Sequence, residues 1–338
     1  MAKCWEKILS SKKEAPPRHD DTPNYAVQNP DLDTARSNIL GKDLELCTRV
    51  TPEEVQNVMD HLSNNKQPGP DRRPNELLKM ASGGPHFSPV VASIFSTFIN
   101  VGVIPEEWHD SCTFLIYKSG DAADPTNYRP IALLNTFNKA FTSVINNRLS
   151  KFLEKNNILA EMQGGFRPGR TTFTKIWTLV QTIEHAKHHK HPLHVAYIDL
   201  KKAYDSVEHW GLLSVLQRYG FSAQFSKLIM TLCKGNTSQI ITPHGLTRKI
   251  NITRGVRQGC PLLPTLFILF LNPLLQKLET SDLGYKLGDK SLPGGAFADN
   301  IVLTTSSYLT IQKQFNFCIS FCDHFGLDMA IDGRDKTV

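Results

Sequence analysis

Two aspartates occupy places in the sequence where a carboxylate is costly. Asp199 follows the apolar run 195–198, and Asp299 stands between the apolar runs 297–298 and 301–303. A carboxylate at the end of a buried strand must be paired or must hold a metal ion. If the two strand ends are neighbours, both carboxylates can share hard cations such as Mg²⁺, which bind carboxylate and phosphate oxygens. Two such ions about 3.5–4 Å apart can activate a hydroxyl and stabilise a leaving pyrophosphate. Taken alone, each aspartate is more simply explained as the cap of a turn.

The pattern of the second half predicts the elements that position these acids. Residues 194–200 read as a strand that ends in Asp199, and a hairpin over 295–305 carries Asp299 and Asn300 at its tip. Further elements are predicted around them: a helix over 206–219, a hairpin over 238–242 and 247–253, and helices over 264–279 and 308–325.

The first half is mainly helical in pattern. Thr51 can cap a helix in which Pro52 fits the first turn and Glu54 completes a capping box. Helical spacing continues over 75–100, 136–153 and 172–187, and 112–117 reads as a short strand. Residues 1–50 are polar and show little periodicity, so we expect a poorly ordered lead-in.

Composition narrows the class of protein. The chain has 338 residues, 40% of them hydrophobic and 21% charged, which excludes a wholly disordered protein and is enough for about two domains. Its net charge of +6 mildly favours a polyanionic partner. The seven cysteines include no CxxC pair, and Cys318 and Cys322 fit core packing on one helix face. With no signal peptide or membrane-spanning segment, an intracellular location, cytoplasmic or nuclear, is expected.

Six ordered sequence blocks resemble the reverse-transcriptase domain of non-LTR, LINE-type retrotransposons. The palm blocks are Asp199 to Asp205 (DLKKAYD), Gly255 to Leu262 (GVRQGCPL) and Phe297 to Asn300 (FADN). Upstream, KQPGPD at 66–71, NYRPI at 127–131 and QGGFRPGR at 163–170 match the family's earlier blocks in the same order. The resemblance covers about residues 50–338.

The resemblance implies an α+β fold, the fingers and palm of a right-hand polymerase. Fingers would occupy 51–190 and the palm 191–338, together forming one reverse-transcriptase domain after the lead-in 1–50. A small antiparallel palm sheet flanked by helices would carry the acids. The chain ends at the last palm block, so we expect the thumb to be missing, and we expect no endonuclease domain ahead of the fingers.

The implied activity is RNA-directed DNA polymerisation, in which a primer 3′-OH attacks a dNTP. Asp199 and Asp299 would hold two Mg²⁺ ions, or Mn²⁺ in their place, with the backbone carbonyl of Leu200. Tyr204 would be the gate under the incoming sugar, although its ring could also be a core aromatic. Lys336 resembles a lysine that protonates the departing pyrophosphate.

The resemblance also assigns the groups that bind the dNTP and the primed RNA or DNA template. Lys118 and Arg129 would clamp the triphosphate through charge-assisted bonds, or be an exposed basic loop. Gln258 and Gly259 would line the nucleotide and the template base. Seven basic residues become candidate phosphate contacts, of which we expect about half to touch nucleic acid: Arg167, Arg170, Lys175, Arg248, Lys249, Arg254 and Arg257.

Asn300 is the main departure from the family pattern, which has a second aspartate there. A neutral amide is a weaker cation ligand, so we expect lowered metal affinity and strongly reduced activity. Other departures are Leu263 in place of serine and the pair Arg72–Arg73. They favour an alternative in which the chain is an inactive retroelement remnant that at most binds nucleic acid. A phosphatase or nuclease built on the same acids lacks any added His or Glu cluster.

Overall fold

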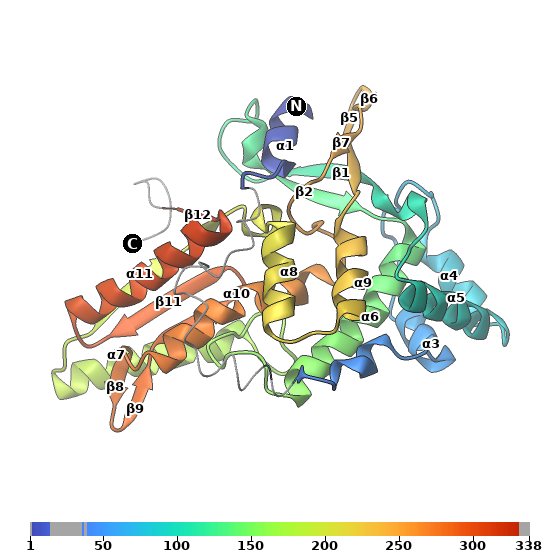
Figure 1. The fold of residues 1–338 in the computed structure, drawn as a ribbon. Helices are drawn as coiled ribbons and strands as arrows, with labels where there is room; N and C mark the ends of the chain where they lie inside the picture. Colours follow the sequence, from blue (N-terminus) through green and yellow to red (C-terminus); the bar gives the residue numbers. More distant parts are fainter. Residues whose placement is uncertain (1, 14–35, 37–38, 331–338) are drawn as a thin grey trace. The chain divides into compact units, whose positions relative to one another are not determined.

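The computed structural model describes residues 2–13, 36 and 39–330 (Figure 1). They form two compact units. The first combines the described residues of 1–11 with 39–152 and 220–263, and the second combines those of 12–38 with 153–219 and 264–330. Both units mix helices with β-sheet, as expected for a mixed α and β class. The units interleave along the chain, and the division into fingers over 51–190 and palm over 191–338 stays a prediction.

Helices contribute much of the first unit. They are α1 (Ala2–Leu9), α3 (Pro52–Asp60), α4 (Asn75–Ser82), α5 (Phe87–Val101), α6 (Thr136–Lys155) and α9 (Ala223–Cys233), with short 3-10 turns η1 (Asp43–Cys47), η2 (Glu106–His109) and η3 (Pro125–Asn127). The predicted capping box is present: Glu54 N donates to Thr51 Oγ1 and Thr51 N donates to the Glu54 carboxylate. The helix predicted over 75–100 is two helices, because 83–86 interrupt it.

The lead-in 1–50 was expected to be poorly ordered, but its described residues form regular structure near both of its ends. Residues 2–9 form α1, whose Trp5 is buried against Ile240 and Ile250. Residues 43–47 form η1, with Leu46 buried. Both elements are shorter than the windows in which periodicity is recognisable, and their order comes from tertiary packing.

A mixed sheet completes the first unit. Strand β1 (Asp110–Tyr117) pairs antiparallel with β2 (Tyr128–Leu133) and parallel with β5 (Thr237–Thr242). Strand β5 also pairs antiparallel with β6 (Gly245–Leu246) and β7 (Ile250–Asn251). The hairpin around 243–244 was predicted. The parallel pairing of β1 with β5 was not, because it joins segments far apart in the sequence.

The second unit is built around the apolar helix α10 (Leu263–Thr280). Its other helices are α7 (Thr172–His189), α8 (His209–Arg218) and α11 (Tyr308–Phe325), with the 3-10 turn η4 (Ala203–Ser206). Phe270 of α10 meets Phe321 and Phe325 of α11, with ring centroids 5.8 and 5.0 Å apart. Cys318 and Cys322 are buried on α11, as predicted, and burial raises the pKa of Cys322 to about 12.

The sheet of the second unit carries the predicted acids. Strand β11 (Asn300–Thr305) lies between β10 (Gly294–Phe297) and β3 (His194–Ile198), antiparallel to both. Helix α7 packs against β10, and α11 packs against β11 and β3. Two smaller pairs were not predicted: β4 (Leu200–Lys201) with β12 (Asp328–Met329), and β8 (Tyr285–Leu287) with β9 (Lys290–Leu292).

Candidate active site

The turn between β10 and β11 consists of Ala298 and Asp299, which we call the acid turn. The pairing of Phe297 with Asn300 makes Asn300 the first residue of β11, so the tip lies one residue earlier than predicted. Ala298 is buried and adopts a left-handed conformation, with φ of +57°. Asp299 is half-buried and Asn300 is exposed. The carboxylate of Asp299 is therefore carried by a tightly constrained backbone.

Asp199 follows the strand next to this turn. Strand β3 pairs with β11 so that Ile198 faces Ile301, which places Asp199, one residue further on, beside the start of β11. Asp199 is half-buried, and its carbonyl oxygen accepts a hydrogen bond of 2.9 Å from Ala330 N. The two strand ends are neighbours, which is the condition under which both aspartates could serve one site.

The donor groups around the acid turn suit a hard cation. Asp199 and Asp299 offer carboxylate oxygens, and Leu200 and Asn300 offer neutral carbonyl oxygens. Within the described ranges, no group of three or more His, Cys, Asp or Glu side chains is arranged to hold a metal ion. Mg²⁺ is nevertheless bound through one or two carboxylates, with water and substrate phosphate completing its shell. This pair of aspartates therefore fits Mg²⁺ better than a metal that needs a full protein cage.

Tyr204 lies in η4, on the segment that follows Asp199. Its ring centroid is 4.6 Å from that of Phe267 in α10, and the residue keeps part of its surface exposed. Leu200 is buried in β4. The packing against Phe267 fits the core-aromatic interpretation, and the remaining exposure leaves a face that a sugar could meet.

The predicted triphosphate ligands belong to the first unit, at one end of the β1–β2 hairpin. Arg129 pairs across the hairpin with Ile116, and Lys118 N donates to Asn127 O at 2.9 Å. Both Lys118 and Arg129 are exposed. The structure thus brings the two cations to the same hairpin, with both in contact with solvent.

Gln258 and Gly259 lie against β2 in the same unit. Ala132 N donates to Gln258 O at 2.6 Å. Gly259 has a φ of +117°, and a Cβ there would lie 2.3 Å from Ala132 O, so only glycine fits. These residues and the β1–β2 hairpin therefore form one substructure of the first unit, while Asp199, Leu200, Tyr204, Asp299 and Asn300 belong to the second.

Three of the seven predicted phosphate contacts are buried. Arg254 Nε donates to Ile8 O at 2.8 Å, and Arg257 Nη1 donates to Trp108 O at 3.1 Å. Only 3% of the Arg167 side chain is exposed. Since these guanidinium groups face backbone carbonyls in the interior, the prediction that they contact phosphate is not supported. Sequence alone could not separate them from exposed arginines.

The other four cations keep part of their side chains exposed: Arg170, Lys175, Arg248 and Lys249. Arg170 forms an ion pair of 2.7 Å with Glu161, whose carbonyl oxygen accepts from Lys175 Nζ at 2.6 Å. Arg248 pairs with Glu6, and Lys249 with Asp110. Exposed ion pairs of this kind contribute little to stability and can exchange partners, so these four remain candidates. Lys336 lies outside the described residues.

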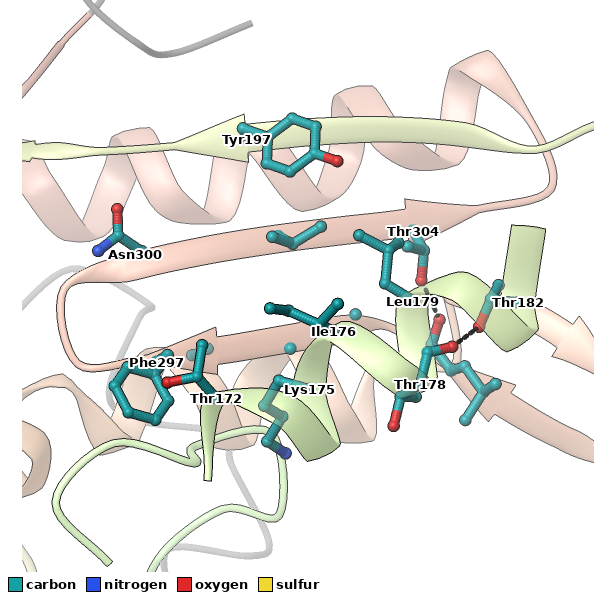
Figure 2. Close-up of a pocket in the computed structure, with 15 residues that line it drawn as sticks. Thr172, Lys175, Ile176, Thr178, Leu179, Thr182, Tyr197, Phe297, Asn300 and Thr304 are labelled. Atoms are coloured by element: carbon teal, nitrogen blue, oxygen red, sulfur yellow. Dashed lines mark hydrogen bonds between the residues drawn. The ribbon is translucent and has the colours of Figure 1, made fainter. Parts of the chain in front are cut away.

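A cavity of about 220 Å³, which the sequence did not suggest, lies between part of α7 and the sheet of the second unit (Figure 2). Its walls are mainly apolar and include Ile176 and Leu179 of α7 and Tyr197 and Val302 of the sheet. Asn300 lines one end of it, as Figure 2 shows. The face of the sheet that carries Asn300 is therefore hollowed rather than filled by α7.

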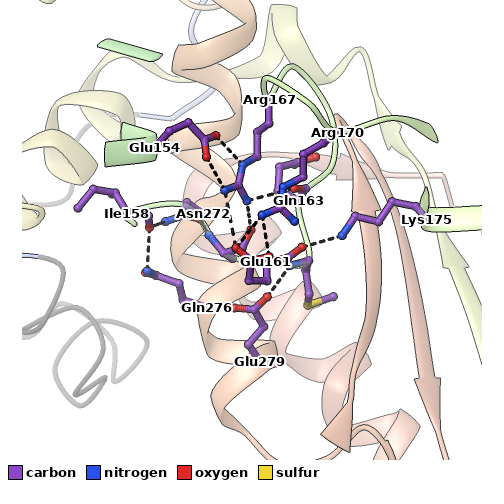
Figure 3. A network of polar contacts seen from close by, with 12 residues as sticks. Glu154, Ile158, Glu161, Gln163, Arg167, Arg170, Lys175, Asn272, Gln276 and Glu279 are labelled. Carbon is purple, nitrogen blue, oxygen red and sulfur yellow. Dashed lines mark hydrogen bonds and ion pairs between the residues drawn. The ribbon is translucent and has the colours of Figure 1, made fainter. Parts of the chain in front are cut away.

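A polar network fixes the loop 158–170, which precedes α7 (Figure 3). Arg167 binds Glu154 through two hydrogen bonds of 2.7 and 2.8 Å and donates to Ala160 O at 2.8 Å. Met162 N donates to Glu279, whose pKa is raised by burial even though this bond lowers it in part. A bidentate arginine–carboxylate pair holds geometry well, so this loop is rigidly anchored.

None of the described helices is long and apolar enough to cross a bilayer.

Comparison with known proteins identifies relatives of this chain. Residues 116–332 match the family model described as reverse transcriptase (RNA-dependent DNA polymerase). A 149 kDa protein of transposon TX1 from Xenopus laevis is 28% identical over 79% of this chain and 20% of its own length. The Pol polyprotein of retrotransposable element R2 from Popillia japonica is 33% identical over 60% of this chain and 28% of its own length.

A third relative is the probable RNA-directed DNA polymerase of transposon X-element from Drosophila melanogaster. It is 28% identical over 79% of this chain and 29% of its own length. The chain thus spans between a fifth and a third of the length of these relatives.

Proposed function

Since this chain belongs to the reverse-transcriptase family, with relatives in non-LTR retrotransposons, we propose that it is the polymerase domain that extends a primer 3′-OH with dNTPs on an RNA template. The observation that carries the proposal is the register of β3 with β11, which sets Asp199 beside the acid turn. Within the fold we propose that residues 51–190 act as fingers and 191–338 as palm.

In this proposal Asp199 and Asp299 hold two Mg²⁺ ions, or Mn²⁺, with the carbonyl of Leu200 as a further ligand. When bound, the ions would activate the primer hydroxyl and stabilise the leaving pyrophosphate. Asp299 lies in the constrained turn between β10 and β11, and Asp199 lies between strands β3 and β4, which pair with β11 and β12. Asn300 contributes a neutral oxygen where a third charge would strengthen cation binding, so activity is impaired.

Nucleotide-binding roles are proposed for residues within each unit taken by itself. Lys118 and Arg129 neutralise the triphosphate, and Gln258 and Gly259 contact the nucleotide and the template base. Tyr204 underlies the sugar, where an aromatic ring excludes a ribose 2′-hydroxyl and so favours deoxynucleotides. Lys336, beyond the described residues, supplies the proton to pyrophosphate.

Primed template is held by phosphate contacts from exposed cations. Arg170, Lys175, Arg248 and Lys249 are the candidates that the structure leaves partly open to solvent. Phosphate contacts carry no sequence information and weaken steeply with salt. Affinity for primed RNA should therefore fall as salt rises.

A second candidate function, nucleic-acid binding without catalysis, is favoured by Asn300. In that case the chain is an inactive remnant in which the missing carboxylate abolishes polymerisation.

The experiment is primer extension on primed RNA in Mg²⁺ and in Mn²⁺, with Asp199→Ala as the matched inactive variant. Dissociation constants for the same primed RNA are measured at two salt concentrations. Extension that Asp199→Ala abolishes supports the polymerase. If no form extends the primer, not even Asn300→Asp, but primed RNA still binds in a salt-sensitive way, the result supports the inactive remnant that only binds nucleic acid. Extension that survives Asp199→Ala contradicts the assignment of the metal ligands.

A further inference from the structure

The loop segment 162–165 lies along β10 as an additional short edge of the sheet. Ala296 N donates to Met162 O at 2.8 Å, and Gly164 N donates to Ala296 O at 2.8 Å. These two bonds bracket Gln163, which forms a parallel bridge with Ala296. The segment therefore follows β10 toward the acid turn.

The side chain of Gln163 ends on the backbone of that turn. Its Oε1 accepts from Ala298 N at 2.9 Å and from Gly165 N at 2.8 Å, and its Nε2 donates to Ala298 O at 3.2 Å. Two backbone N–H groups donate to Oε1 and one backbone carbonyl accepts from Nε2. This pattern fixes which way round the side-chain amide of Gln163 lies. Gln163 is fully buried, so water does not compete for these bonds.

The residue that Gln163 holds is strained. Ala298 has a φ of +57°, a region that costs a non-glycine residue roughly 1–2 kcal/mol. Such a conformation persists only where the surroundings over-determine it. Gln163 contacts both the amide and the carbonyl of Ala298, and so constrains the peptide planes on either side of it.

The backbone of the loop segment 162–165 lies very close to that of the acid turn, which adds to the constraint on Ala298. A Cβ on Gly165 would lie 2.3 Å from Ala298 N, so glycine is required for the loop to reach the acid turn. At the other end, Arg167 donates to Gln163 O at 3.3 Å while it binds Glu154 (Figure 3). The loop is thus anchored to α6 on one side and to the acid turn on the other.

We propose that Gln163 is a positioning residue for Asp299: its buried amide sets the backbone of Ala298 and thereby the direction of the next carboxylate. This inference rests on the proposed function, because it assigns Asp299 a role in polymerisation. Gln163 makes no contact with substrate in this proposal and acts through the turn alone.

The test compares Gln163→Met with Gln276→Met in the full chain and in its Asn300→Asp form. Methionine keeps the side-chain volume but loses the amide. Gln276 is a matched control, because it is buried in the same unit and bonds Ile158 O at 3.1 Å and Tyr219 OH at 2.7 Å. Both variants should lose similar thermal stability, since each leaves buried polar groups unpaired.

Only Gln163→Met should alter the site. Supporting residues around a metal site typically change metal affinity or activity by about 10–100-fold. We expect kcat for dNTP incorporation to fall in that range while the KM for dNTP changes little, and Mn²⁺ affinity, titrated by EPR of the free ion, to weaken. Gln276→Met should keep both at the level of the parent chain.

A readout independent of catalysis is amide hydrogen exchange at Ala298 and Gly165. Exchange should accelerate at both in Gln163→Met, with Val302 in the same sheet unchanged. If no form polymerises, the polymerase proposal fails, while exchange and Mn²⁺ affinity still decide the role of Gln163. Unchanged exchange and Mn²⁺ affinity in Gln163→Met would overturn the positioning role, as would equal losses of kcat in both methionine variants.

Discussion

Two hairpins of this protein have turns of the same length and opposite character. The acid turn, Ala298 and Asp299, joins strands in which Phe297 faces Asn300. The turn of Pro243 and His244, which we call the exposed turn, joins β5 to β6, where Thr242 faces Gly245. Each turn has two residues between antiparallel strands, yet the sources of their stability differ.

The exposed turn is held by its own residues. His244 N donates to Thr242 Oγ1 at 3.3 Å, and Thr242 Oγ1 donates to Gly245 O at 2.7 Å. The positive φ, +110°, falls on Gly245, where it costs little. In the acid turn the positive φ falls on Ala298, whose amide and carbonyl bond the side chain of Gln163, 135 positions away.

A turn can therefore be stable for local reasons or because contacts with distant parts of the fold impose its conformation. A turn of the second kind holds its side chains in a direction that the local sequence does not prefer. Strained backbone of this type concentrates at functional sites.

The largest expected effect is on catalysis at the acid turn. Asp299→Ala should lower primer extension by about 10³-fold or more, because the developing charge loses a ligand for its stabilising cation. His244→Ala, the matched change in the exposed turn, should leave extension at the parent level. Rates of single-nucleotide incorporation measure both, and comparable losses would mean that the two turns do not differ in function.

The change Asn300→Asp tests the contribution of the residue that follows the acid turn. Restoring a carboxylate should raise extension by about 10²-fold, because an anionic ligand binds Mg²⁺ more strongly than an amide. The gain should be greatest at low Mg²⁺, which a titration of rate against Mg²⁺ concentration reveals. A rate that stays unchanged at every Mg²⁺ concentration would remove Asn300 as the cause of impairment.

Gly165→Ala should disturb the acid turn through its neighbour. The new Cβ would lie 2.3 Å from Ala298 N, and forced backbone movement of this kind costs about 1–3 kcal/mol. Denaturant unfolding should show the loss, and extension should fall with it. Gly164→Ala is the stability control, because its Cβ would meet the flexible end of Lys175. Equal stability of the two variants would contradict the close approach.

The smallest effect is expected at the exposed turn. Gly245→Ala should lower the free energy of unfolding by about 1 kcal/mol, since a positive φ disfavours alanine, although open space surrounds the position. Extension should remain at the parent level. A loss of activity as large as that of Gly165→Ala would show that the two turns are coupled.

Local chemistry explains which elements were predictable. The capping box of α3, strand β1, the β10–β11 hairpin and α11 all follow from spacing or turn residues near at hand. Helix α9 and the β8–β9 hairpin were not predicted. Both segments nevertheless carry local signals: the side chain of Ser222 caps α9 by accepting from Phe225 N, and Gly288–Asp289 is a favourable two-residue hairpin turn between β8 and β9.

Some residues of the candidate site could likewise be predicted from local sequence, and others could not. The acids Asp199 and Asp299 could be found because carboxylates interrupt apolar runs. The burial of Arg167, Arg254 and Arg257 could not, because an arginine paired with interior carbonyls has the same local sequence as one on the surface. Gln163 belonged to a recognised block, but its hydrogen bonds to Ala298 depend on the approach of two distant segments.

The linear sequence is enough to identify the family blocks, the acids at two strand ends, the amide at position 300 and the locally encoded helices and turns. The folded chain is needed to show that β3 and β11 are neighbours, that β5 joins β1, and that a buried glutamine bonds the acid turn. The two sets differ because the interactions behind them act over different ranges. Capping and turn preferences act over a few residues, whereas strand register and buried hydrogen bonds depend on segments that meet only when the chain has folded.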